Sequence, residues 1–143
     1  MHLFGRLVQY RIFPDKAEMS LYIALAIGGS LGAVARYWVQ TSTHQWLGFG
    51  FPYGTLTVNI VGSSLMGFLS VLLVSRFELS EAIRVGLLVG FLGSFTTFST
   101  FAMDTLQLTE NGAILKAASY ILLSVLCCII GAWAGLLTAK QLV

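Results

Sequence analysis

The chain has 143 residues, of which 57% are hydrophobic and only 10% are charged, and its mean hydropathy is +0.84. A soluble domain of this length needs more charged side chains at its surface, so the composition indicates that lipid is the solvent. The formal charge is only +2, and no run of Lys and Arg forms a basic stripe, which argues against nucleic acid as a partner.

Residues 1–20 mix apolar and charged side chains without a sustained apolar core, so we expect an amino-terminal tail and not a cleavable signal peptide. Residues 21–143 are expected to form a single membrane domain. Met19 stands directly before the first apolar segment. Either translation starts at Met19, or the tail folds onto the membrane surface.

Four apolar segments follow, each long enough for a hydrocarbon core that needs about 20 helical residues. The third is too long for one ordinary span and is rich in Gly, Ser and Thr near its middle, so we expect a helix break close to residues 93–97. The expected fold is all-α, with four transmembrane helices joined by short connections. The predicted spans are residues 21–40, 53–75, 81–110 and 113–138.

Small residues four positions apart recur in three of the spans. This spacing lets helix backbones approach closely, so it predicts helix packing. Asn111 and Gly112 predict a helix stop after the third span. The spaced pairs are Gly28 and Gly32, Gly86 and Gly90, and Gly131 and Gly135.

Polar side chains recur at every fourth position in two spans, which places each set along one helix face. A single membrane Ser or Thr often bonds back to its own helix, and a lone Asn is as compatible with helix packing as with function. Two aligned rows of hydrogen donors indicate a polar pathway, and since neither row contains an acid, the ion they favour is an anion. The rows are Thr55, Asn59 and Ser63, and Tyr120, Ser124 and Cys128.

Three further features each leave two readings open. Phe98 and Phe101 share a face, either as packing residues or as positive ring edges that hold a desolvated anion. The carbonyl groups of the broken segment need either a packed helix crossing or a monovalent cation. Arg36 either extends to the membrane interface or attracts anions at a vestibule.

Orientation is set by the distribution of basic residues. With the amino terminus in the cytoplasm, that side carries most of them, as the positive-inside rule requires. The tail supplies three of these charges, so a chain starting at Met19 would have almost no preferred orientation.

Three motifs occur in order and with specific spacing: GSLGAVARY at residues 29–37, GTLTVN at 54–59 and GFLGSFTTFSTF at 90–101. With these motifs, the chain strongly resembles the Fluc (CrcB) fluoride channels of bacteria, over residues 21–143. The resemblance implies a dual-topology homodimer of antiparallel subunits in the bacterial inner (plasma) membrane. Its two pores would pass fluoride passively down the electrochemical gradient and so reduce cytoplasmic fluoride toxicity.

The resemblance also implies roles for individual residues. A structural sodium ion would be held at the dimer interface by backbone carbonyls of Gly93 and Thr96. Cys128 stands where a serine or another small polar residue is expected, and Arg36 matches an arginine near the vestibule. The implied fluoride pathway consists of Asn59, Phe98, Phe101, Thr55, Ser99, Thr100, Tyr120 and Ser124.

The alternative function is a small dual-topology transporter of drugs or anions coupled to protons. Such a transporter should carry an acid in its first span, and residues 21–40 contain none. Asp104, late in the third span, is the one poor candidate for proton coupling. An enzyme is not expected, because His2 and His44 lie outside the predicted spans and no cluster of metal ligands is evident. A purely structural subunit would not explain two donor rows and a broken helix.

Overall fold

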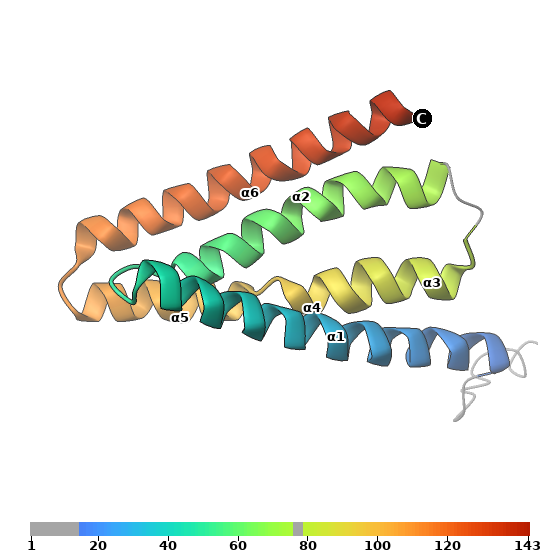
Figure 1. Ribbon diagram of the computed structural model, residues 1–143, viewed down its shortest axis with the longest axis horizontal. Helices are drawn as coiled ribbons and strands as arrows, with labels where there is room; N and C mark the ends of the chain where they lie inside the picture. Colours follow the sequence, from blue (N-terminus) through green and yellow to red (C-terminus); the bar gives the residue numbers. More distant parts are fainter. Residues whose placement is uncertain (1–14, 76–78) are drawn as a thin grey trace, which may run out of the picture.

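The computed structural model describes residues 15–75 and 79–143, and every regular element within these ranges is helical. The helices run roughly along one long axis (Figure 1), with α2 beside α6 and α1 beside the third span. The elements are α1 (Lys16–Leu47), α2 (Tyr53–Ser75), α3 (Glu81–Val85), the π-helical η2 (Gly86–Leu92), α4 (Gly93–Phe95), α5 (Phe98–Glu110) and α6 (Ile114–Leu142).

Four helical segments are long and apolar enough to cross a membrane, which confirms the predicted number of spans. The third of them is composed of α3, η2, α4 and α5. The segments are Glu18–Leu47, Tyr53–Leu73, Glu81–Glu110 and Ile114–Leu142.

Helix α1 begins where Asp15 caps it. Oδ1 of Asp15 accepts a hydrogen bond from the Glu18 N–H (2.9 Å), and Oε2 of Glu18 accepts one from the Asp15 N–H (3.1 Å). These bonds satisfy backbone donors that a first helical turn leaves unpaired. The helix therefore starts within the predicted tail, of which residues 1–14 lie outside the described ranges.

Helix α1 also continues beyond residue 40, where its predicted span ended. His44, which we expected in a connection outside the spans, lies in the last turn of α1. The hydroxyls of Thr41 and Thr43 donate back to the carbonyls of Tyr37 and Val39, so the polar residues remain satisfied within the helix. The helix stops at Gly48, whose φ of 78° lies in the left-handed region that glycine adopts readily.

Glycines allow two helix pairs to pack at very short distances. A Cβ atom at Gly28 would lie 2.1 Å from the carbonyl oxygen of Gly86, and one at Gly135 would lie 2.2 Å from that of Ser64. No side chain fits at such distances without moving the neighbouring backbone. The spaced glycines thus mark helix packing between α1 and η2 and between α2 and α6, as predicted.

The third span departs from α-helical geometry at two places. Its middle, Gly86–Leu92, is π-helical where it packs against α1, a feature that the sequence did not predict. It then breaks at Thr96 and Thr97, whose backbones are extended, before α5 begins at Phe98. The break falls within residues 93–97, where the sequence predicted one.

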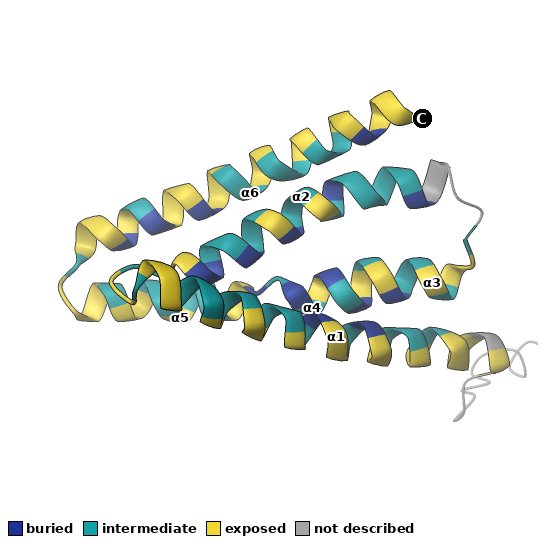
Figure 2. Cartoon of the chain, viewed as in Figure 1, coloured by how far each residue is buried: buried dark blue, intermediate teal, exposed yellow. Residues whose placement is uncertain are grey.

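The surface of the described chain is largely apolar (Figure 2), with many large hydrophobic side chains exposed along the helices. Only 6% to 28% of the most apolar window of each span is buried. Since water does not tolerate so large an apolar surface, the hydrocarbon of a bilayer must cover most of it. The chain is a multi-pass membrane protein.

Candidate functional site

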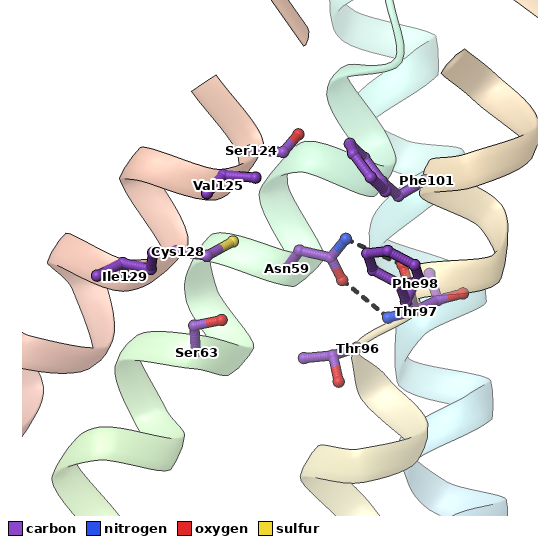
Figure 3. A pocket seen from close by; sticks show the side chains of 10 residues that line it. All are labelled: Asn59, Ser63, Thr96, Thr97, Phe98, Phe101, Ser124, Val125, Cys128 and Ile129. Atoms are coloured by element: carbon purple, nitrogen blue, oxygen red, sulfur yellow. Dashed lines mark hydrogen bonds between the residues drawn. The ribbon is translucent and has the colours of Figure 1, made fainter. Parts of the chain in front are cut away.

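A cavity of about 300 Å³ lies where α2 and α6 face the break and the start of α5 (Figure 3). It brings together side chains that the sequence placed on three separate spans. Members of both polar rows line it, together with the two phenylalanines. The lining residues are Asn59, Ser63, Thr96, Thr97, Phe98, Phe101, Ser124, Val125, Cys128 and Ile129.

Asn59 joins α2 to the break through both ends of its amide. Its Nδ2 donates to the carbonyl oxygen of Thr97 (3.0 Å), and its Oδ1 accepts from the Thr97 N–H (2.8 Å), as the dashed lines in Figure 3 mark. These backbone groups lose their helical partners where the helix breaks. One amide therefore satisfies both, and the second N–H of Nδ2 is left for another acceptor.

Thr97 in turn caps α5. Its Oγ1 accepts from the Thr100 N–H (3.2 Å), and it lies 2.9 Å from Oγ1 of Thr100 and 3.3 Å from Oγ of Ser99. Ser99 and Thr100, both predicted pathway residues, thus surround the capping hydroxyl and do not line the cavity. The cluster fixes the first turn of α5, from which both phenylalanines project.

The break also changes the surroundings of two carbonyl groups, those of Gly93 and Thr96. In a continuous helix their donors would be the N–H groups four residues later, on Thr97 and Thr100. Here the Thr97 N–H donates to Asn59 and the Thr100 N–H donates to Oγ1 of Thr97. Gly93 is exposed on this single chain, so a ligand or a second subunit has access to the backbone there.

Ser124, like Thr97, is a buried polar residue of the cavity. Its side chain is only 6% exposed, and its Oγ has no hydrogen-bond partner among the described residues. A buried hydroxyl without a partner costs about 1–3 kcal/mol, so the native state needs something to fill this position. An ion or a water molecule in the cavity would do so.

Phe98 and Phe101 lie together at the cavity with their ring centroids 5.3 Å apart and their planes tilted by 43°. Phe98 is 79% exposed on this chain. A side chain used only for packing within the subunit would be covered by the subunit. The exposure therefore leaves the ring edge free to meet an ion or a second subunit.

Thr55 and Tyr120, also predicted pathway residues, lie outside this cavity. Thr55 is buried, and its Oγ1 accepts from Nε2 of Gln40 (3.2 Å). Tyr120 is fully buried, and its hydroxyl donates to Oδ2 of Asp104 (3.2 Å). Its ring packs against Phe101, with centroids 5.2 Å apart, so it adjoins the cavity wall.

A second cavity of about 300 Å³ lies at the end of the molecule where the α1–α2 connection meets α5. The sequence did not predict it, because its members come from distant segments without a shared spacing. Arg36, the expected vestibule residue, lines neither cavity and is partly buried on α1. The lining residues are His44, Phe49, Phe51, Pro52, Asp104, Gln107, Leu108 and Asn111.

The first cavity offers hydroxyls, an amide, a thiol and aromatic edges, and no charged side chain lines it. Such a set replaces the hydration of an anion without holding it as tightly as a fixed cation would. Within the described residues no three His, Cys, Asp or Glu side chains group as metal ligands. The chemistry that the site supports is therefore binding of a small ion.

Comparison with known families identifies the chain. Residues 23–136 match the family described as CrcB-like protein, Camphor Resistance (CrcB). The chain belongs to this family. The resemblance carried by the three motifs is confirmed.

Curated relatives of this CrcB-like chain are named "Fluoride-specific ion channel FluC". One from Methylococcus capsulatus is 52% identical over 125 residues, covering 87% of this chain and 54% of the relative. One from Geobacter sulfurreducens is 41% identical over 124 residues, covering 87% of this chain and 100% of the relative. One from Magnetococcus marinus is 46% identical over 116 residues, covering 81% of this chain and 94% of the relative.

This CrcB-like chain therefore spans about half the length of the Methylococcus relative and nearly all of the other two. The names of the relatives describe channels and not enzymes. The prediction that the chain is not an enzyme agrees with its family.

Proposed function

We propose that this chain is a fluoride-selective ion channel that lets fluoride leave the bacterial cytoplasm passively, down its electrochemical gradient, and so lowers fluoride toxicity. Two relatives that this chain covers almost completely are named as fluoride-specific ion channels. The observation that carries the proposal is the cavity beside the break, where the buried Ser124 hydroxyl has no partner within the described chain.

The chemistry of the cavity suits a small, hard anion. The free N–H of Asn59 and the Ser124 hydroxyl supply hydrogens, and Phe98 and Phe101 supply ring edges with partial positive charge. Because no cationic side chain lines the cavity, an anion would be stabilised without being trapped. The implied route continues past Tyr120 and Thr55 toward the second cavity, with Arg36 near a vestibule.

Passive flow is favoured over proton coupling by the position of the acids. Asp104 is the only acid between the terminal residues Glu81 and Glu110 of the third span, and it accepts a hydrogen bond from Tyr120 while lining the second cavity. A proton-coupled transporter needs an acid that exchanges its proton at the substrate site. The first cavity has none among its lining residues.

The working unit is an antiparallel homodimer with two pores, in the inner membrane. Support comes from the Phe98 ring and the Gly93 backbone, which are both exposed on this chain and so are accessible to a second subunit. A structural sodium ion fits the carbonyls of Gly93 and Thr96, because the donors that a continuous helix would give them are engaged elsewhere. Bound there, sodium would neutralise those carbonyl dipoles and join the two subunits.

The deciding experiment is fluoride efflux from proteoliposomes that contain the full chain, with chloride as the control anion. We expect fast fluoride efflux, little chloride efflux and no need for an imposed proton gradient. The double variant Phe98→Ile/Phe101→Ile should slow fluoride efflux by at least about tenfold, since aliphatic side chains lack the positive ring edge. Its matched control is Phe68→Ile, a half-buried ring on α2 that lines neither cavity.

Efflux that needs a proton gradient would favour the transporter instead. An unchanged rate of fluoride efflux in the double variant would show that the two phenylalanines do not line the pathway.

A further inference from the structure

Cys128 lies inside the first cavity, and it is the position at which this chain departs from the residue expected there. It is a free, half-buried thiol on the same face of α6 as Ser124, one helical turn away. Figure 3 shows its sulfur directed toward α2, where Ser63 and Asn59 line the opposite wall. A group attached to this sulfur would extend into the cavity.

A second observation shows that the cavity is built to hold something. Ser124 is more than nine-tenths buried, and its Oγ has no partner among the described residues. A polar position of this kind binds a water molecule or an ion, and the cavity volume of about 300 Å³ is sufficient for several. Water in this cavity would reach the Cys128 thiol, which must lose its proton before it reacts as a thiolate.

Cys127 provides an internal contrast. It is the only other cysteine in the chain, and it is not among the residues that line this cavity. Neighbouring residues on a helix point about 100° apart, so the two thiols face different surroundings.

We propose that Cys128 is a modification site, at which a small sulfur electrophile of the thiosulfonate or disulfide class forms an adduct that closes the ion pathway. The closure rests on the proposed function, whereas the selective reaction at Cys128 does not. The thiol first loses its proton to water. The thiolate then attacks the sulfenyl sulfur of a methanethiosulfonate, a new S–S bond forms, the thiosulfonate S–S bond breaks, and methanesulfinate leaves with the electron pair.

The test uses the full chain in proteoliposomes and 2-sulfonatoethyl methanethiosulfonate, which leaves a fixed negative charge on the sulfur. In Cys127→Ser, which keeps Cys128, we expect one adduct per chain by intact mass. We expect fluoride efflux to fall at least about tenfold, because a like charge in a confined site repels an anion. Dithiothreitol should restore both the mass and the rate.

Cys128→Ser, which keeps Cys127, is the matched control, with its rate compared only with its own untreated rate. It should gain little mass and keep that rate. Equal labelling of the two cysteines would overturn Cys128 as a selective modification site. Complete labelling of Cys128 with unchanged fluoride efflux would overturn the claim that the adduct closes the pathway. If untreated protein passes no fluoride, the proposed function and the closure both fail, and the labelling preference alone then decides the modification site.

Discussion

Asn59 and Thr97 exchange two hydrogen bonds across the interface between α2 and the broken third span, at 3.0 and 2.8 Å. The bond pattern gives Asn59 a structural role that is separate from any contact with an ion. It satisfies both backbone groups of the residue that ends the break. Replacement of Asn59 should therefore change the hydrogen bonding of the Thr97 backbone as well as the rate of fluoride efflux.

Replacement of Asn59 by Asp tests this double role. The carboxylate still accepts from the Thr97 N–H, but it cannot donate to the Thr97 carbonyl and it adds a negative charge. We expect fluoride efflux to fall by about tenfold or more, since a negative charge in the cavity repels the ion. Amide hydrogen exchange at Thr97 should remain slow, because that bond is kept.

Asn59→Ala is the comparison. It removes both bonds and should speed exchange at Thr97, with a loss of about 1–3 kcal/mol in stability. Slow exchange in Asn59→Ala would contradict the assigned bonds.

Thr97→Val removes the hydroxyl that caps α5 while keeping the shape of the side chain. The Thr100 N–H then loses its acceptor, and we expect the variant to lose about 0.5–2 kcal/mol of stability. Thermal unfolding in detergent measures this loss. Thr109→Val is the control, because its hydroxyl only donates back to the Thr105 carbonyl on an exposed helix face; a similar loss in both variants would argue against the cap.

Gly28→Ala should destabilise the contact between α1 and η2. The new Cβ would lie 2.1 Å from the Gly86 carbonyl oxygen, so the helices must move apart. Overpacking of this kind costs about 1–3 kcal/mol, and we expect a lower midpoint of thermal unfolding in detergent. Gly50→Ala is the matched control because nothing lies within 4 Å of its Cβ position; an unchanged midpoint in Gly28→Ala would mean that the helices are not in close contact.

Tyr120→Phe removes the hydroxyl that donates to Asp104 and keeps the buried ring. The Asp104 carboxylate loses a donor at the wall of the second cavity, so we expect a loss of about 1 kcal/mol in stability. Fluoride efflux should slow if the route passes this point. A stable variant with a normal rate would place the pathway elsewhere.

Replacement of sodium by N-methylglucamine throughout purification and reconstitution tests the proposed sodium site. This large cation cannot enter a carbonyl cage, so we expect less dimer in crosslinking and slower fluoride efflux, both restored by added sodium. Equal dimer content in the two cations would argue against a structural sodium ion.

Hydropathy located the membrane spans well, because it reports where hydrocarbon surrounds the chain. Helix α2 begins and ends at the predicted residues 53 and 75. The end of α1 was missed because the polar turn after residue 40 stays helical outside the most apolar region, where Thr41 and Thr43 bond back to their own helix. Hydropathy does not separate a polar helical turn from a loop.

The candidate site was predictable in its members and not in its connections. The four-residue spacing placed Asn59 in one polar row and Ser124 and Cys128 in another, and members of both rows line one cavity. The bonds from Asn59 to Thr97 join residues 38 positions apart, and no local pattern specifies such a pair. The π-helix at Gly86–Leu92 likewise accompanies close packing against α1, which depends on another part of the chain.

The bond between Asn59 and Thr97 has a consequence for biogenesis. The broken segment cannot satisfy its own backbone, and in hydrocarbon each unpaired group costs several kcal/mol. Helix α2 precedes the third span in the chain, so Asn59 leaves the ribosome before Thr97. The second and third spans should therefore enter the bilayer as a pair, with the earlier helix acting as an intramolecular chaperone for the later one.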